Sequence, residues 1–314
     1  ANLLCGRIHP DFFLGGKMKP DEESMLAAFQ ELNEELGMEG SEIANGILDI
    51  ANANMVNALK LISVNKGLDP RDFSLMVFGG GGAMHAAFLA EALQISEIII
   101  PVNASVFSAL GMLLSDLRRD FFRTDVKKLG VEELPFFKSI LKEMDRHAIE
   151  QYKWDGYAGE EIQFEYFADL RYAGQEHYVK VALDASPDSE EDLLAISQAF
   201  HKAHKKQYTF ELDAPIEWVN YHLVATIPLK KPQFPKLKLH ERDLSQALYG
   251  SAEVDFGSFG KHKAQVFERE KLTRTMQIEG PAIIAESATS TVLPPGFKLR
   301  LDEWGNLIVQ REEK

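Results

Sequence analysis

Residues 73–120 read FSLMVFGGGGAMHAAFLAEALQISEIIIPVNASVFSALGMLLSDLRRD, and this stretch decides the fold class. The apolar run at 74–78 is followed at once by four glycines, which predicts a buried strand that ends in a tight turn. The alanine-rich residues 83–94 have the composition of a helix. The triple isoleucine at 98–100 predicts a second buried strand, and residues 103–117 predict a further helix.

The turn consists of Gly79, Gly80, Gly81 and Gly82. Glycines lack a Cβ, so they can adopt positive φ and let a ligand approach the backbone closely. The helix that follows offers unpaired N–H groups and the positive end of its dipole, which favours a phosphate or the ribose of a nucleotide. A plain tight turn would explain the same glycines. The run is not a Walker loop, because no Lys-Ser or Lys-Thr pair follows, and it lacks the G-x-G-x-x-G spacing of dinucleotide sites.

The wider stretch closely resembles the hydantoinase A / 5-oxoprolinase family, which includes N-methylhydantoinases and the ATP-handling subunit of acetone carboxylase-type enzymes. The shared pattern is a strand, a glycine turn, a His-Ala helix, a strand that ends at proline, and a Ser-Ala-x-Gly helix. In this sequence the pattern falls on Gly79, Gly80, Gly82, His85, Ala86, Pro101, Ser108, Ala109 and Gly111. One departure is Ala83, where the family usually has proline.

The resemblance implies an α/β fold: the C-terminal lobe of an actin/hexokinase/Hsp70-like (ribonuclease H-like) ATPase, followed by an α+β, β-rich C-terminal domain. We expect residues 1–127 to form the ATPase-like part and residues 128–314 the second domain. The resemblance places the adenosine side of ATP at Gly79–Gly82, with His85 and Ser108 also at the nucleotide. Mg²⁺ is implied together with ATP. No metal ligand and no catalytic residue is assigned in this chain.

The activity that the resemblance implies is ATP-dependent hydrolysis of cyclic amides of the hydantoin or 5-oxoproline type, in which phosphorylation of the amide oxygen activates the carbon for water. Two alternatives stay open: the ATP-handling subunit of an acetone carboxylase-type enzyme, and a non-catalytic fragment that binds a partner. The family's Asp-x-Gly-Gly-Thr phosphate loop does not occur in the sequence. We therefore interpret the chain as the C-terminal portion of a larger protein, inactive alone, whose partners are the missing N-terminal lobe and a B-type subunit within an oligomer.

Composition narrows the class of protein. The chain has 314 residues, 45% of them hydrophobic and 26% charged, which is typical of a globular protein of about two domains. A formal net charge of -14 disfavours nucleic-acid binding. We identify no apolar run long enough to span a bilayer. The single cysteine, Cys5, excludes an internal disulfide and fits a reducing compartment, so a cytoplasmic location is expected.

Outside the glycine stretch, a few other residues are candidates for chemistry. His201 and His204 are three residues apart in a predicted helix, a spacing that could hold a metal, but no third ligand is evident and we favour a structural role. Asp116 and Asp120 follow the predicted helix at 103–117, and we interpret both as acids that cap or solvate a helix end. The segment DLRYAGQEHYVKV at 169–181 predicts a hairpin and resembles the family's C-terminal domain at Arg171, Tyr172, Gly174 and Gln175.

Overall fold

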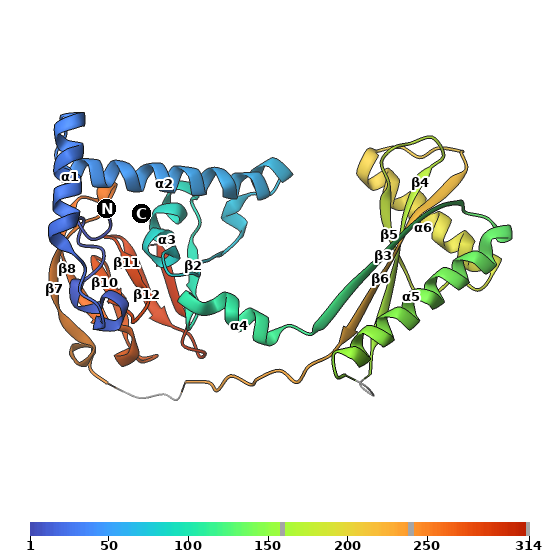
Figure 1. Cartoon of the computed structure of the whole chain (residues 1–314). Coiled ribbons are helices and arrows are strands. Elements are labelled where there is room, and N and C mark those ends of the chain that lie inside the picture. The colour runs from blue at the N-terminus through green and yellow to red at the C-terminus, as the bar shows by residue number, and fades with distance from the viewer. Residues whose placement is uncertain (158–160, 238–241, 312–314) are drawn as a thin grey trace. The chain divides into compact units, whose positions relative to one another are not determined.

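The computed structural model describes residues 1–157, 161–237 and 242–311 (Figure 1). The chain divides into two compact units. Unit 1 comprises Ala1–Leu113 and Gln233–Lys314, and unit 2 comprises Leu114–Pro232. Unit 2 is therefore an insertion in the chain of unit 1, and each unit is described by itself.

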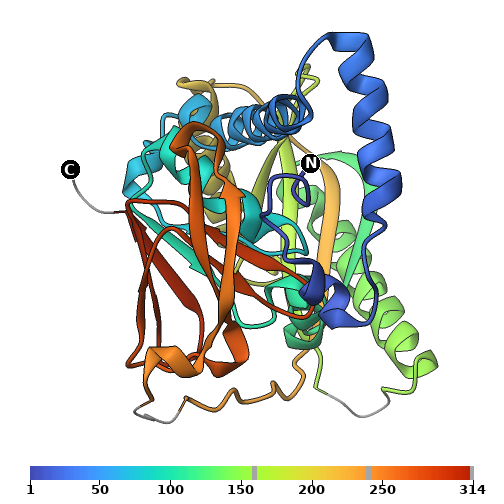
Figure 2. The ribbon, with the colours of Figure 1, turned by 90° about the vertical axis from the view of Figure 1, so that its left-hand side faces the viewer.

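Near its start, unit 1 has two helices, α1 (Glu22–Leu36) and α2 (Gly40–Ile62), which run in different directions and contact one another (Figure 2). The side chain of Asp21 accepts a hydrogen bond from the backbone N–H of Ser24 at the start of α1. Gly37 ends this helix with φ of 66°, the left-handed conformation that a C-terminal glycine commonly adopts.

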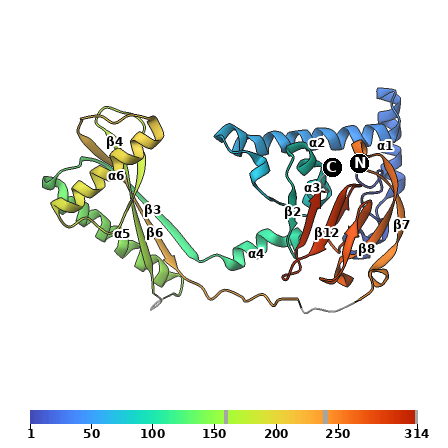
Figure 3. The ribbon, with the colours of Figure 1, turned by 180° about the vertical axis from the view of Figure 1, so that it is seen from behind.

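The first sheet of unit 1 joins segments from the two ends of the chain. It has the order β1 (Leu75–Met76), β2 (Glu97–Ile100), β13 (Leu307–Arg311), β12 (Phe297–Leu301), β9 (Gln277–Glu279). β1 and β2 are parallel, and β13 pairs with β2 antiparallel in the register Ile98 to Val309. Figure 3 shows β12 and the other C-terminal strands, in red, next to β2, although they are far apart in the sequence.

A second sheet completes unit 1, in the order β11 (Ser290–Leu293), β10 (Ala282–Ala285), β8 (Lys261–Glu268), β7 (Leu248–Asp255). Helix α3 (Gly82–Leu93) packs against β2 and β11. Most of its side chains are buried, and they belong to cores that include strands from both sheets. This explains why the sequence of α3 is apolar on nearly every face rather than along one stripe.

Unit 2 is a sheet with helices on one face. The sheet is antiparallel, in the order β3 (Leu117–Lys128), β6 (Ile216–Ile227), β4 (Gln163–Tyr172), β5 (Val179–Leu183). Helices α5 (Leu134–Trp154) and α6 (Glu190–Tyr208) share one apolar core with this sheet. Ser189, which precedes α6, and Asp192, in its first turn, form a capping box that fixes where the helix begins.

The domain boundary expected at residue 127 stays a prediction, and the compact units group the chain in another way. Residues 233–314, expected to belong to the second domain, fold with residues 1–113. The physical reason is the pairing of β13 with β2, because a buried parallel pair such as β1 and β2 needs a further strand on its open side. Short strands near the C-terminus carry no sequence signal that names a partner so distant in the chain.

Helix α2 also departs from expectation. Residues Gly40–Lys66, which include α2, are long and apolar enough to cross a membrane by length and composition, whereas the sequence analysis identified no such run. One such helix is weak evidence for a membrane, because core helices pass the same test. Here Ile43, Leu48 and Val56 are buried within unit 1, while Ile50 and Leu61 are exposed.

The alternating burial of β2 gives a test of the first sheet. Ile98 is 1% exposed in the main core of unit 1, whereas Ile99 lies on the opposite face and is only partly buried. We expect Ile98→Ala to lower the free energy of unfolding by about 2–5 kcal/mol, because it leaves a cavity. Ile99→Ala is the matched control and costs clearly less in urea denaturation. Equal losses for the two variants would contradict the packing described here.

Candidate nucleotide-binding site

The glycine turn lies between β1 and α3, where the sequence predicts it. Gly79 has φ of +86°, which glycine adopts readily and other residues rarely do, and the other three glycines do not have positive φ. Its N–H donates a hydrogen bond of 2.7 Å to the carbonyl oxygen of Ala104. A Cβ built on Gly79 would meet no atom within 4 Å, so the space above this residue is open.

Gly80 contacts the turn between β10 and β11 of the second sheet. The hydroxyl of Thr289 donates a 2.9 Å hydrogen bond to the carbonyl oxygen of Gly80. A Cβ on Gly80 would lie 3.6 Å from the carbonyl oxygen of Ala288, an ordinary van der Waals contact. The fold therefore does not require glycine at position 80 for steric reasons. Gly80 and Gly81 are exposed, whereas the N–H groups of Gly82 and Met84 at the start of α3 donate to the carbonyl oxygens of Gly79 and Gly81, at 3.4 and 3.2 Å.

A pocket of about 160 Å³ opens beside the turn. One wall consists of Gly80 and Met84, and the opposite walls come from the β10–β11 hairpin and the N-terminal segment. The lining residues are Ile8, Phe12, Phe13, Leu14, Gly80, Met84, Glu286, Ala288, Thr289 and Ser290. Ligand pockets usually measure roughly 300–1,000 Å³, so this one can hold only part of a nucleotide.

His85 and Ser108, the other two predicted contacts, are near the turn in sequence but are engaged differently. Nδ1 of His85 lies 2.7 Å from the side-chain oxygen of Asn52 on α2, and burial lowers the pKa of the imidazole. Ser108 is exposed on α4 (Phe107–Leu114), the helix that follows Ala104. Ala104, just before α4, therefore contacts Gly79. Neither His85 nor Ser108 lines the pocket.

A buried ion pair that the sequence analysis missed supports the pocket. Nη1 of Arg269 lies 2.7 Å from Oε1 of Glu286, and the two side chains are 9% and 15% exposed. The guanidinium of Arg269 also donates to the carbonyl oxygens of Pro101 and Gly305, at 3.2 and 3.1 Å. Burial raises the pKa of Glu286, and the charge of Arg269 opposes that shift. The pair joins the pocket wall to the end of β2, and neither residue has a sequence neighbour that indicates this role.

The remaining sequence candidates have structural roles. Nδ1 of His204 lies 2.9 Å from the carbonyl oxygen of Phe210, and Nδ1 of His201 lies 2.7 Å from the hydroxyl of Tyr172. Among the described residues, no group of three or more His, Cys, Asp or Glu side chains could hold a metal ion. Cys5 is 3% exposed, and burial raises the pKa of its thiol, so it is poorly suited to act as a nucleophile.

The two aspartates that follow α4 do not share one role. Asp116 accepts hydrogen bonds from the backbone N–H of Leu229 and from Lys231. Asp120, which we had interpreted as a residue of a helix end, lies on strand β3 and contacts Arg118 and His222. That interpretation is wrong for Asp120 because the chain is already extended from Leu117 onward.

Comparison with known proteins assigns the family. Residues 1–121 match the model of the hydantoinase/oxoprolinase family, and residues 127–312 match that of the hydantoinase/oxoprolinase C-terminal domain. This chain belongs to the hydantoinase/oxoprolinase family.

Two curated relatives and one solved structure illustrate the range of this family. The caprolactamase subunit alpha of Pseudomonas jessenii is 29% identical over 96% of this chain. The acetone carboxylase beta subunit of Xanthobacter autotrophicus is 24% identical over 96% of the chain. This chain spans 44% of each relative's length. A nucleotide-free structure of acetone carboxylase shares the mixed α/β fold with a TM-score of 0.84 and 22% identity, over 99% of this chain and 46% of the other.

The buried ion pair gives a second test. Arg269→Met removes the cation and leaves the carboxylate of Glu286 buried without its partner, which we expect to cost about 3–5 kcal/mol of unfolding free energy. The double variant Arg269→Met with Glu286→Gln removes both charges and should recover much of that loss in chemical denaturation. A double variant no more stable than the single one would show that the buried charge is not the cause.

Proposed function

We propose that this chain supplies the adenosine side of the ATP site in an ATP-dependent hydrolase of cyclic amides. The observation that carries the proposal is the turn at Gly79–Gly82, which combines a positive φ, open space above Gly79 and the N-terminus of α3. An open backbone at a helix N-terminus suits a ribose or phosphate group. The relation to caprolactamase, whose name denotes action on a lactam, supports a cyclic amide as the substrate class.

The fit to ATP is partial. The residues around the turn offer backbone groups and an apolar pocket, but they offer no carboxylate cluster for Mg²⁺ among the described residues. When bound, ATP would supply the phosphoryl group that activates the amide. Backbone groups of Gly80 and Gly81 would orient the nucleoside, and Thr289 would hold Gly80 in place. We propose that the Mg²⁺ ligands and the phosphate loops come from the part of the relatives' length that this chain does not span.

Exposed apolar side chains on unit 1 support the proposal that a further part of the protein packs against this unit. Phe73, Met76 and Phe78, in and around β1, are each 49% exposed, and β1 is an edge strand of its sheet. On α4, Met112 and Leu113 are 78% and 71% exposed. Large apolar side chains gathered at an uncovered strand edge indicate an interaction surface. We propose that upstream residues of the same protein, within an oligomer that includes a B-type subunit, cover this surface.

A second candidate function is the ATP-handling subunit of a carboxylase. The similarity to the acetone carboxylase beta subunit along nearly the whole chain favours it. The two candidates differ in the acceptor of the phosphoryl group, which is an amide oxygen in one case and a ketone enolate or bicarbonate in the other. ATP consumption measured separately with hydantoins or lactams, and with a ketone plus bicarbonate, distinguishes them in the assembled enzyme.

Two glycine variants separate nucleotide contact from turn formation. Gly80→Val places a side chain in the pocket without backbone strain, so we expect nucleotide affinity to fall tenfold or more, which is about 1.4 kcal/mol. Gly79→Ala tests the conformation of the turn. It forces a Cβ onto a positive φ and should cost about 1–3 kcal/mol of stability.

The measurement combines nucleotide titration with thermal melting, on the chain together with the upstream portion that its relatives possess. Gly80→Val should melt close to the unmodified protein. Normal nucleotide affinity in a folded Gly80→Val protein would remove this turn from the nucleotide site.

A further inference from the structure

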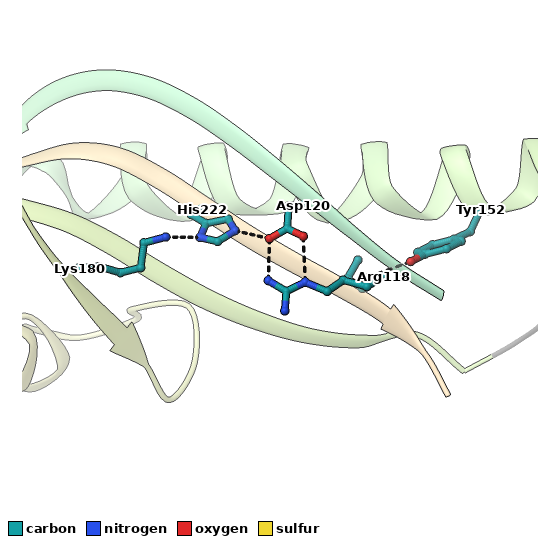
Figure 4. A network of polar contacts seen from close by, with 6 residues as sticks. Arg118, Asp120, Tyr152, Lys180 and His222 are labelled. Carbon is teal, nitrogen blue, oxygen red and sulfur yellow. Dashed lines mark hydrogen bonds and ion pairs between the residues drawn. The ribbon is translucent and has the colours of Figure 1, made fainter. Parts of the chain in front are cut away.

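The uncovered face of the unit 2 sheet carries a chain of polar contacts that crosses the sheet (Figure 4). Nζ of Lys180, on β5, lies 3.0 Å from Nδ1 of His222, on β6. Nε2 of His222 lies 2.7 Å from Oδ1 of Asp120, on β3. Arg118 donates two hydrogen bonds of 2.8 Å to the same carboxylate, and the pair with Arg118 holds the pKa of Asp120 at about 2.

These contacts define the protonation of the imidazole. A lysine ammonium has only donors, so Nδ1 of His222 must accept its hydrogen bond and carries no proton. The ring proton therefore lies on Nε2 and is donated to Asp120. His222 is 4% exposed. Its ring stacks between those of its two cross-strand neighbours, with a distance between ring centroids of 4.0 Å to Phe122 and 5.2 Å to Phe167. The neutral ring is thus tightly packed, with Lys180 at one nitrogen.

A second acceptor for Lys180 is close by and is incompletely paired. Asp169, on β4, is directly opposite Lys180 in the register and is 3% exposed. Asn220 donates a 3.0 Å hydrogen bond to Oδ2 of Asp169, while Oδ1 is buried with no hydrogen-bond partner among the described residues. A buried carboxylate oxygen without a donor is costly, so this position favours any cation that can reach it. Side chains opposite each other on adjacent strands are close enough to make that contact.

We propose that this face is a pH-operated lysine switch. Protonation of His222 puts a proton on Nδ1, so the ring and Lys180 become two donors of like charge and their contact breaks. Lys180 then moves to Oδ1 of Asp169, while His222 keeps its bond to Asp120. Lys180 no longer covers the ring in that state, and the cationic imidazole becomes accessible from the uncovered face.

The other charged groups around His222 are consistent with this exchange. Asp120 and Arg118 face the ring from β3, Glu165 and Asp169 lie on the same face of β4, and Lys180 comes from β5. Helices α5 and α6 pack on the opposite face, in the apolar core. Asp120 already accepts two hydrogen bonds from the guanidinium of Arg118. The carboxylate oxygen that lacks a donor among the described residues is Oδ1 of Asp169, on the strand next to that of Lys180.

The test is NMR of the 314-residue chain with ¹⁵N-labelled histidine and lysine, recorded from about pH 5 to 8, where histidine changes charge. We expect the Lys180 side-chain signals to shift with the same midpoint as the His222 ring nitrogens, and cross-strand contacts between Lys180 and Asp169 to appear at the acid end. In Asp169→Asn, which is nearly isosteric, Lys180 should still leave His222, but the acid-state contact between Lys180 and residue 169 should be lost.

Glu165→Gln is the matched control, because it removes another carboxylate from the same face of β4 without removing the proposed acceptor. Lys180 should still follow His222 in this variant. Lys180 signals that stay constant while the ring signals of His222 change, or an acid-state contact between Lys180 and residue 169 that is equally strong in Asp169→Asn and in Glu165→Gln, would overturn the proposal. Whether the Lys180 signals follow those of His222 is measured on the unmodified chain. The proposal therefore stays testable if a variant fails to fold.

Discussion

The pairing of β13 with β2 is the interaction on which the position of the glycine turn depends. β2 lies between β1, which carries the glycine turn, and β13, which comes from the last residues of the chain. Without β13, the short parallel pair of β1 and β2 would be open on both sides and would have too few hydrogen bonds to hold the turn in place. The site is therefore built from two parts of the sequence that unit 2 separates.

Further contacts reinforce this arrangement from the second sheet. Thr289 holds the carbonyl of Gly80, and Arg269 joins Glu286 to the end of β2. α3 packs between these elements and is apolar on nearly every face. The turn is thus fixed on both sides, because the N–H of Gly79 donates to Ala104 and the carbonyl oxygen of Gly80 accepts from Thr289. Preorganised backbone of this kind lowers the ordering cost of binding.

The sequence predicted the local elements well. The four glycines, the alanine-rich helix and the triple isoleucine each specify their own conformation, so α3, β2 and the turn lie where the pattern places them. The pairing of β2 with β13 and the ion pair of Arg269 with Glu286 could not be predicted in this way. Both join residues that are distant in the chain, and a single sequence holds no signal for which distant strand or charge is the partner. The contacts that join Lys180, His222 and Asp120 across the sheet could not be predicted for the same reason.

The most direct test of the central claim is a structure of this chain, together with the part of its relatives' length that it does not span, bound to a non-hydrolysable ATP analogue. The account predicts that the ribose or an adjoining phosphate lies within hydrogen-bonding distance, about 3 Å, of backbone groups in Gly79–Gly82. It also predicts that the nucleoside extends toward the pocket beside Thr289. A nucleotide bound elsewhere, with this turn contacting only protein or solvent, would contradict the account.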